Sequence, residues 1–568
     1  MKTKSQISFA ISQLGQVMIV GLFFGVLVSV VAHFFVEGVK YLSSPRLSVE
    51  PFNISGFDIH YVQVFTLTLA AVLIYAVKKI LMIGRWQGPA DTIYGAHRPD
   101  NELDVKVGLS STLVAFISAS GGASVGQYGP LVHFGAVIGS ACKRFLKIDL
   151  STDVFIGCGV AAAISAGFNA PIAGVVFAHE AILRHFSLRA IAPIAIASCV
   201  ATGTSEVLWP ETKLFELNDF SGDFSTLLPI ALFLGPIFGL VAVALMQSVR
   251  HTTRFVASKG LRPEQGLFIA VLITSIGGAF VPEALGLGGA TIDSIINLEF
   301  SLGFLIILLL MKIALTTACL GFGLFGGIFS PSLLVGAAAG ALALYLGTIV
   351  GLDITSSLGI IVCGMAAVSS SVIGAPIAGV MIVLELTGSY EYALVAMISI
   401  VTSVLTSHFL FGHSFFDRQL ADRGIDIAGG RTGLEMMERS IATILHQDFT
   451  KLSKDMTAEK SISKMLENEV TEAYVLEKEN AFLGKVTLQS LLMAKAQEEL
   501  SSLLENDPIT IKSDASLQQA MEVAVQFVGE SIPIVDRENN RLLGVVTEAD
   551  LFRDYLALQN KIVDLERR

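Results

Sequence analysis

The sequence predicts an all-α, polytopic (multi-pass) membrane domain made of two related halves, followed by a soluble α/β module. Hydrophobic residues make up 53% of the 568 residues and charged residues only 15%, whereas soluble proteins contain about 25% charged residues. Two motifs recur in the same order, at offsets of 201 and 205 residues. After Phe416 the composition changes, and a charged connector leads into a segment rich in Glu and Asp.

The apolar segments predict the membrane helices. The first runs from Leu14 to about Val36, which is long enough to cross a hydrocarbon core of about 30 Å as a helix. It is also longer than the h-region of a cleaved signal peptide. Apolar segments continue to about Leu410, and many are Gly-rich or interrupted by Pro, such as residues 121–139 and 321–340. Such segments are typical of broken or re-entrant helices inside a bundle.

Charge predicts the orientation and excludes some partners. The N-terminus and the short loops that contain Lys78, Lys79, Arg85, Lys143 and Arg144 carry positive charge, so we expect them on the cytoplasmic side. The net charge of −11 resides largely in the C-terminal module, which argues against nucleic-acid binding. We expect a multi-pass protein of the bacterial inner (plasma) membrane with its C-terminal module in the cytoplasm, since no organelle-targeting segment is recognisable.

The internal repeat points to the site. Residues 169–175 read NAPIAGV and residues 374–380 read GAPIAGV, and a similar Pro-containing segment recurs at Pro130 and Pro331. Duplicated halves with interrupted helices are typical of transporters whose binding site lies at the repeat interface. Pro suits the first turn of a helix, where unpaired N–H groups favour an anion. Two such helix starts meeting inside the membrane would bind a small anion.

The same segments resemble a known family. Residues 327–331, GIFSP, resemble the GIFxP motif of the CLC chloride channel and transporter family, and residues 126–130, GQYGP, resemble its G-K/R-E-G-P motif. The resemblance extends over nearly the whole chain and includes a pair of CBS domains. It implies the CLC fold of inverted repeats, a homodimer in the lipid bilayer with one anion pore per subunit, and chloride binding by backbone amides at Gly327, Ile328 and Phe329.

Three departures from the family pattern decide the predicted mechanism. Tyr128 takes the place of the gating glutamate, and Ala181, which follows Glu180, takes the place of the internal proton-transfer glutamate. Phe416 replaces the tyrosine that the family uses to bind the anion. Because the ordinary pKa of a tyrosine is about 10 and that of a glutamate about 4.3, Tyr128 cannot exchange a proton at working pH. We therefore expect a channel-like chloride pathway that is uncoupled from protons.

Two roles for Tyr128 stay open. With Gln127 and Gly129 it forms the predicted gate, and an offset of 201 residues pairs it with Phe329 in the other repeat. Its neutral hydroxyl could donate a hydrogen bond to the anion and thereby replace the hydroxyl that is missing at Phe416. Alternatively, the Tyr128 ring is a passive plug that narrows the pore.

Other site positions are marked less clearly. The family's serine-bearing segment falls near residues 86–89, where Gln87 is the candidate and Trp86 the competing alignment. A plain loop residue is the alternative role for Gln87. Glu180 neighbours the vacated proton-transfer position, but consecutive residues of a helix face directions about 100° apart. We expect His179 to be a hydrogen-bonded buried histidine and not a proton relay.

The C-terminal module carries a second candidate site. Apolar strand-like runs at 532–535 and 542–546 alternate with amphipathic helical stretches such as 517–527, which predicts an α/β fold. The tail resembles a CBS pair, and residues 544–550, GVVTEAD, fit the part of that motif in which Thr and Asp bind a nucleotide. This resemblance implies an adenine-nucleotide site at Thr547 and Asp550. Ser490 replaces the Asp in the first domain, so that site is expected to be degenerate, and a purely structural, dimerising pair is the alternative.

The predicted domains and the rival functions complete the interpretation. We place the membrane domain at residues 1–430, with inverted repeats at roughly 14–215 and 225–415, a linker at 431–439, and the two CBS domains at 440–495 and 496–560. We expect no enzymatic activity, no metal and no resident cofactor. The first rival is a chloride/proton or fluoride/proton antiporter, which needs a titratable group in the pathway. The second is a CBS-regulated divalent-cation transporter, which needs acidic residues at the membrane site, and residues 107–142 contain none.

Overall fold

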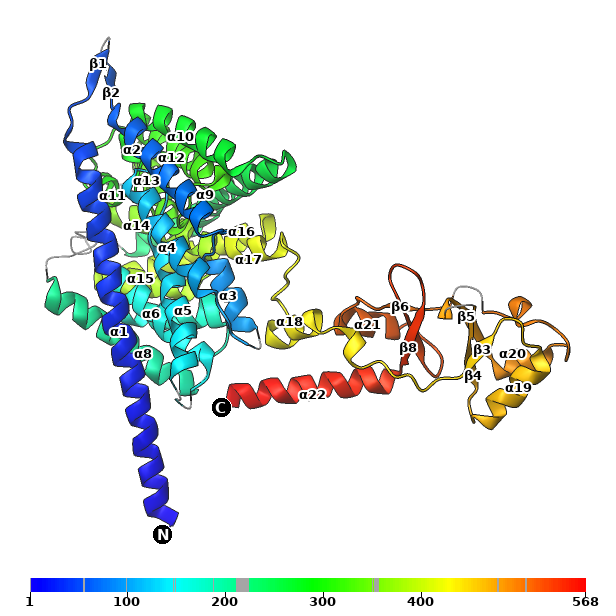
Figure 1. Cartoon of the computed structure of the whole chain (residues 1–568). Helices are drawn as coiled ribbons and strands as arrows, with labels where there is room; N and C mark the ends of the chain where they lie inside the picture. The colour runs from blue at the N-terminus through cyan, green and yellow to red at the C-terminus, as the bar shows by residue number, and fades with distance from the viewer. Residues whose placement is uncertain are drawn as a thin grey trace. The chain divides into compact units, whose positions relative to one another are not determined.

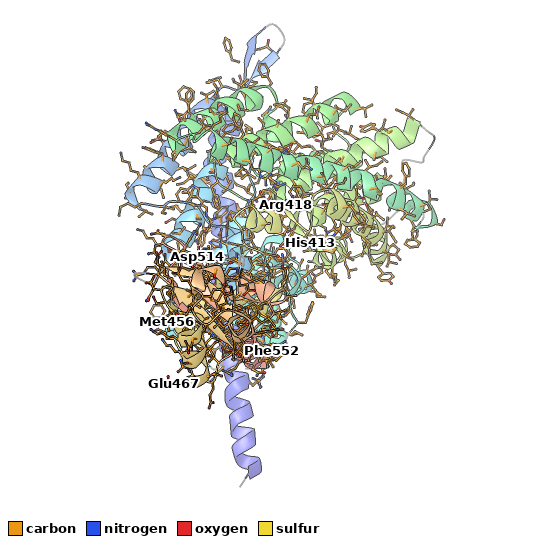
Figure 2. The ribbon with its side chains drawn as sticks, turned by 90° about the vertical axis from the view of Figure 1, so that its right-hand side faces the viewer. His413, Arg418, Met456, Glu467, Asp514 and Phe552 are labelled. Atoms are coloured by element: carbon orange, nitrogen blue, oxygen red, sulfur yellow. The ribbon has the colours of Figure 1, made fainter. Side chains whose placement is uncertain are left out.

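The computed structural model describes residues 2–54, 57–98, 100–146, 148, 150–186, 188–210, 224–349, 351, 357–477, 480–505 and 508–567. The chain divides into two compact units, Met1–Ile425 and Asp426–Arg568. Each is drawn in Figure 1, and Figure 2 labels His413 and Arg418 in the first unit and Met456, Glu467, Asp514 and Phe552 in the second. The predicted junction between the two membrane repeats, at about residues 215–225, lies mostly within 211–223, which is outside the described residues.

The first unit is a bundle of interrupted helices (Figure 1). Its first half contains α1 (Lys2–Ser48), the antiparallel pair β1 (Phe52–Ile54) and β2 (Phe57–Ile59), α2 (Val62–Ile80), α3 (Pro89–His97), α4 (Val105–Ser120), α5 (Tyr128–Phe145), α6 (Thr152–Phe168), α7 (Pro171–Phe177), the π-helical turn η1 (Ala178–Leu183) and α8 (Leu188–Leu208). Its second half contains α9 (Phe224–Ser258), α10 (Pro263–Phe280), η2 (Pro282–Ala284), α11 (Gly289–Ile296), α12 (Leu302–Phe322), α13 (Phe329–Ile349), α14 (Ser357–Ile373), α15 (Pro376–Thr387), α16 (Tyr390–Leu410) and α17 (Phe415–Ala421).

The bundle is that of a multi-pass membrane protein. Within the described ranges, eight helices are long and apolar enough to cross a membrane. The first of them, α1, continues well beyond the predicted span of residues 14–36, and a Lys40–Glu37 ion pair of 2.7 Å lies on this polar extension. As predicted, the Gly-rich segments are interrupted, because loops precede α5 and α13 and each helix then begins close to its Pro.

Matching glycine contacts relate the two halves. A Cβ on Gly135 of α5 would lie 2.2 Å from the carbonyl oxygen of Gly159 on α6, and a Cβ on Gly336 of α13 would lie 2.3 Å from that of Gly364 on α14. Gly135 and Gly336 are 201 residues apart, and Gly159 and Gly364 are 205 apart. The offsets of the sequence repeat therefore recur as the same close helix–helix contact in each half.

Two glutamates, one in each half, cap the N-terminus of a helix in the other half. The Glu180 carboxylate accepts hydrogen bonds from the backbone N–H groups of Ile377 (3.0 Å) and Ala378 (2.8 Å) in the first turn of α15. The Glu385 carboxylate accepts the equivalent bonds from Ile172 (2.8 Å) and Ala173 (2.7 Å) in the first turn of α7. A carboxylate is favoured at a helix N-terminus. Glu180 therefore stabilises the contact between the halves and is bound at α15.

The second unit contains two repeats of a small α/β motif. The first repeat has β3 (Lys451–Ser453), α19 (Ala458–Glu467), β4 (Glu472–Leu476), β5 (Phe482–Thr487) and α20 (Leu488–Met493); the second has β6 (Ile511–Lys512), α21 (Leu517–Ala524), β7 (Ile532–Val535), β8 (Leu542–Val546) and α22 (Glu548–Arg567). In both three-stranded sheets the first two strands pair parallel and the last two antiparallel. The predicted strands at 532–535 and 542–546 are confirmed, and α18 (Gly430–Glu438) occupies most of the predicted linker.

Candidate anion site

The starts of α5 and α13 are held together by a two-residue bridge. The N–H of Gly126 donates to the carbonyl oxygen of Gly327 (2.6 Å), and the N–H of Gly327 donates back to that of Gly126 (2.7 Å). A Cβ on Gly126 would lie only 2.7 Å from the Ser330 hydroxyl oxygen, so this approach requires glycine. Since α5 begins at Tyr128 and α13 at Phe329, the unpaired N–H groups of two helix starts converge here.

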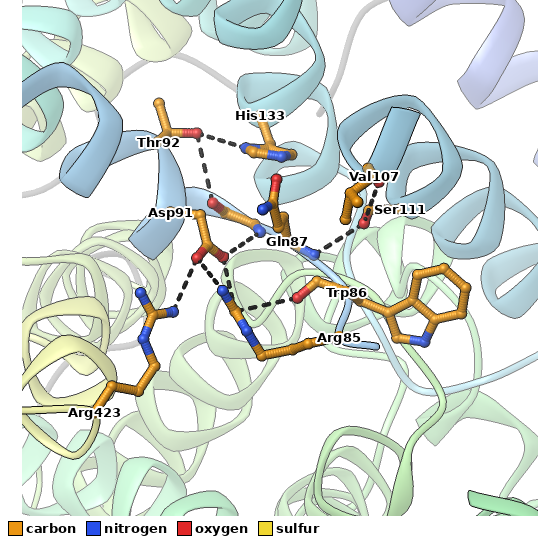
Figure 3. A network of polar contacts seen from close by, with 10 residues as sticks. Arg85, Trp86, Gln87, Asp91, Thr92, Val107, Ser111, His133 and Arg423 are labelled. Atoms are coloured by element: carbon orange, nitrogen blue, oxygen red, sulfur yellow. Dashed lines mark hydrogen bonds and ion pairs between the residues drawn. The ribbon is translucent and has the colours of Figure 1, made fainter. Parts of the chain in front are cut away.

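The start of α3 is close by, but its amides are already bound. A Cβ on Gly129 would lie 3.3 Å from Pro89 Cγ, so the first residue of α3 contacts the start of α5. The Gly88 N–H donates to the Asp91 carboxylate (3.0 Å), and the Gln87 N–H donates to the Ser111 hydroxyl (2.9 Å) (Figure 3). Both backbone donors are thus used by side chains of the protein. The helix ends that remain open to an anion are those of α5 and α13.

Gln87 and Trp86, the two candidates for the position of the family's serine, are neighbours in the loop before α3. The side-chain oxygen of Gln87 is buried without a hydrogen-bond partner among the described residues. The Trp86 ring instead faces Phe325, at 6.4 Å between ring centroids, in the loop before α13. Gln87 is therefore the one of the two that presents an unused polar group near the converging helices.

An aromatic cluster fills the space at the two open helix ends. The Tyr128 ring stacks on Phe168 at 4.1 Å between centroids and 20° between planes, and it lies 5.3 Å from the Phe329 ring. The Phe168 and Phe329 rings are 5.2 Å apart. The Tyr128 hydroxyl donates to the Gly167 carbonyl oxygen at 3.4 Å. The residues Tyr128, Phe168 and Phe329, which we call the aromatic cluster, are all buried.

Sequence reasoning paired Tyr128 with Phe329 but missed Phe168. The latter is the last residue of α6 and directly precedes the motif at 169–175, which was noted only for its repetition in the other half. A Cβ on Gly167 would come within 2.8 Å of the Tyr128 ring. An aromatic residue directly after a glycine at the end of a helix was the available signal, because the glycine admits the stacked ring.

A large cavity ends at the aromatic cluster. It has a volume of about 990 Å³, and Gln127, Tyr128, Phe168 and Ser330 are among its lining residues. The Ser330 hydroxyl and the Gln127 side-chain oxygen are buried and have no hydrogen-bond partner among the described residues. A cavity of this size with unpaired polar groups can hold water. This cavity therefore reaches the starts of α5 and α13, where Tyr128 and Phe168 border it.

The other predicted positions lie around this centre. Phe416 is buried in the first turn of α17, which packs against α3. Ala181 is buried in the turn η1, and the neighbouring Glu180 carboxylate is directed to α15. His179 is wholly buried, and its Nδ1 bonds to the His185 carbonyl oxygen at 2.9 Å. The prediction that His179 is a hydrogen-bonded buried histidine is confirmed.

In the second unit, Thr547 and Asp550 form a compact polar group. The Thr547 hydroxyl donates to the Asp550 carboxylate (2.6 Å), which also accepts from the Thr547 N–H (3.1 Å) and lies 3.2 Å from His446 Nε2. Burial raises the pKa of the Asp550 carboxyl, but the bonds from Thr547 and His446 outweigh burial, and its pKa is lowered overall. In the first repeat, the Thr487 N–H donates to the Ser490 hydroxyl oxygen, and the Ser490 N–H donates to the Thr487 hydroxyl oxygen.

Taken together, the features define a class of membrane transport protein: two repeated halves, interrupted helices and a site at their converging starts. Residues 68–408 match the family described as voltage gated chloride channel, and residues 500–557 match the CBS domain. Because the first match covers more than half of the chain, the protein belongs to the voltage-gated chloride channel (CLC) family. Its fold is the CLC fold followed by a CBS pair.

Similar proteins agree with this assignment. The chain is 26% identical over 338 residues to the voltage-gated ClC-type chloride channel ClcB of Escherichia coli (strain K12 / DH10B), covering 57% of this chain and 78% of that protein. Its structure resembles that of a slow cyanobacterial Cl⁻/H⁺ antiporter, with a TM-score of 0.63 and 18% identity over 72% of this chain and 98% of that one. It also resembles a eukaryotic CLC transporter, with a TM-score of 0.61 and 18% identity over 94% of this chain and 98% of that one. A CLC-type fluoride/proton antiporter is similar as well, with a TM-score of 0.57 and 21% identity over 71% of this chain and 97% of that one.

Proposed function

We propose that this protein conducts chloride passively across the membrane, without coupling to protons. The observation that carries the proposal is the convergence of the α5 and α13 starts on an aromatic cluster in place of a titratable carboxylate. A small anion is stabilised at such helix ends without a full positive charge. In this pathway the backbone amides of Ile328 and Phe329 bind chloride and Tyr128 is the gate. The Gly327 amide, which the sequence also predicted as a chloride donor, is used in the hydrogen bond to Gly126.

The two positions that would carry protons support the uncoupled mode. Ala181 has no titratable group, and the adjacent Glu180 carboxylate is bound by two N–H groups of α15. The alternative is a chloride/proton or fluoride/proton antiporter, as two of the similar solved structures are described. That mechanism requires a group that takes up and releases a proton at the anion site during each cycle.

The setting of this pathway is also proposed. We place the protein in the bacterial inner membrane as a homodimer with one pathway per subunit and with the CBS pair in the cytoplasm. Exposed apolar side chains on α7, α15 and α16, such as Ile172, Ile377 and Phe409, support burial of this face in lipid or against a second copy.

Flux measurements in proteoliposomes test the proton-uncoupled mode. We expect chloride flux whose reversal potential follows the chloride gradient and does not move when a gradient of about one pH unit is imposed. The matched variant Tyr128→Glu places a carboxylate at the gate, and we expect its flux to become blocked in a pH-dependent manner. A reversal potential of the unmodified protein that shifts with the proton gradient would establish coupled exchange and reject the channel mode.

We further propose that an adenine nucleotide binds the CBS pair at Thr547 and Asp550 and regulates flux. The support is an ionised carboxylate held next to a threonine hydroxyl at the start of α22. In calorimetric titrations of the full chain with ATP, ADP and AMP, we expect Asp550→Ala to weaken binding at least about tenfold. Ser490→Ala, in the other repeat, is the matched control. No heat with any nucleotide would leave a purely structural role.

A further inference from the structure

One side chain at the converging helix starts carries a hydrogen-bond donor that the protein does not use. Ser330 is the second residue of α13, and only 5% of it is exposed. Its hydroxyl has no hydrogen-bond partner among the described residues. A buried hydroxyl without a partner is unfavourable, and an ion or water that binds there is a common reason for a protein to keep one.

Ser330 brings two donors to the point where α13 meets the start of α5. A Cβ on Gly126 would lie 2.7 Å from the Ser330 hydroxyl oxygen and 2.8 Å from its backbone nitrogen. N–H groups in the first turn of a helix have no partner within the helix. Because glycine has no side chain, position 126 covers neither donor. The hydroxyl therefore adds a side-chain donor to the N–H groups of this helix start.

The large cavity reaches this hydroxyl. Ser330 lines the cavity of about 990 Å³, whereas the preceding residue, Phe329, lines a second, largely apolar cavity bordered by α13, α14 and α15. Neither Ile328 nor Phe329 is among the residues that line the large cavity. An anion that enters from the large cavity therefore meets Ser330 before it reaches the amides of Ile328 and Phe329.

The other unpaired polar atoms of this cavity cannot take the same role. Among the described residues, four that line it have a buried side-chain atom without a hydrogen-bond partner. Three of these atoms are acceptor oxygens, on Gln63, Gln127 and Glu283. The fourth is the hydroxyl of Ser330, which can donate. The Tyr128 hydroxyl also belongs to a lining residue, but it already donates to the Gly167 carbonyl oxygen at 3.4 Å.

The neighbouring start of α3 offers no substitute donor. The Asp91 carboxylate caps this start and in turn accepts hydrogen bonds from Arg85 and Arg423 (Figure 3). An anion at α3 would have to displace a carboxylate that two guanidinium groups hold. The Ser111 hydroxyl beside this start donates to the Val107 carbonyl oxygen at 2.8 Å. Its donor is therefore already used.

We propose that the Ser330 hydroxyl binds the anion and makes the pathway selective for compact halides over large anions with dispersed charge, such as thiocyanate. The inference rests on the proposed chloride pathway and deepens it by naming a residue that determines its specificity. Hydrogen bonds to an ionised acceptor are stronger than neutral ones, and the gain is larger when the charge is concentrated on one atom. Phe168 and Phe329, which also border the site, provide no side-chain donor that would replace this hydroxyl.

Anion selectivity in proteoliposomes tests the proposal. Flux is measured against chloride concentration, and the permeability ratio of chloride to thiocyanate is taken from the reversal potential with one anion on each side and equal pH on both sides. For Ser330→Ala we expect the chloride concentration at half-maximal flux to rise roughly tenfold, because a hydrogen bond to a charged group is lost. The permeability ratio should fall by about the same factor.

Ser399→Ala is the matched control. Ser399 is on α16, its hydroxyl is likewise buried without a partner among the described residues, and it is not among the residues that line the large cavity. Neither substitution removes a hydrogen bond within the protein, so we expect both variants to unfold at the temperature of the unmodified protein. Only Ser330→Ala should change the permeability ratio.

Two results would overturn the role of Ser330. One is a Ser330→Ala variant whose half-maximal concentration and permeability ratio both stay within about twofold of those of the unmodified protein. The other is a Ser399→Ala variant that changes the permeability ratio as strongly as Ser330→Ala does. Absence of chloride flux through the unmodified protein would reject the proposed function itself, whereas unchanged selectivity in a conducting Ser330→Ala variant would reject only this role.

Discussion

Tyr128→Ala is expected to raise chloride flux about thirtyfold. To open the pathway, the Tyr128 ring must leave its stacked contact with Phe168 and its contact with Phe329, and its hydroxyl must leave the Gly167 carbonyl oxygen. Each aromatic contact contributes about 1 kcal/mol, so opening costs about 2 kcal/mol, which corresponds to roughly thirtyfold in the open population. Alanine removes this cost. Flux per folded protein in proteoliposomes is the measurement.

Two variants separate the gate from general effects on folding. Tyr128→Phe keeps both ring contacts and loses only the long hydrogen bond, so we expect flux within about threefold of the unmodified protein. Phe238→Ala removes a buried ring from α9 and should cost about 3–5 kcal/mol in stability without raising flux per folded molecule. If Tyr128→Ala conducts like the unmodified protein, the aromatic cluster is not the gate.

The repeat made part of this site predictable. Local signals mark where α5 and α13 begin, since Gly-rich segments end in Pro130 and Pro331, and the offset of 201 residues pairs Tyr128 with Phe329. The structure brings this pair to 5.3 Å. The prediction succeeded because duplicated halves that pack face to face must place equivalent helix starts opposite each other.

Contacts between distant segments were beyond sequence reasoning. Phe168 joins the cluster from the end of α6, and Thr92 and His133 meet across 41 residues. Likewise, the Glu180 carboxylate reaches the start of α15 some 198 residues away. Nothing in composition or periodicity indicates which face of a uniformly apolar helix meets which neighbour. The capping of α3 by Asp91 follows a local pattern, but the two arginines that bind this carboxylate depend on the fold.

The bridge between the two halves leads to the second large effect: Gly126→Val is expected to reduce chloride flux at least about a hundredfold. A Cβ at this position would lie 2.7 and 2.8 Å from the Ser330 hydroxyl oxygen and backbone nitrogen, and 3.0 Å from the Gly327 carbonyl oxygen. Two of these contacts are with backbone, which cannot move aside as a flexible side chain would. The starts of α5 and α13 must therefore separate, with loss of both hydrogen bonds between Gly126 and Gly327.

The size of this effect follows from what holds the anion. Each lost hydrogen bond costs about 1 kcal/mol, and the converging N–H groups act on the anion only while the two helix starts stay together. A loss of about 2.7 kcal/mol in anion binding corresponds to a hundredfold. Gly303→Val is the matched control, since a Cβ on Gly303 meets nothing within 4 Å, and it should conduct normally. A folded Gly126→Val protein with unchanged flux would mean that chloride crosses elsewhere, because no anion site at these helix starts could survive their separation.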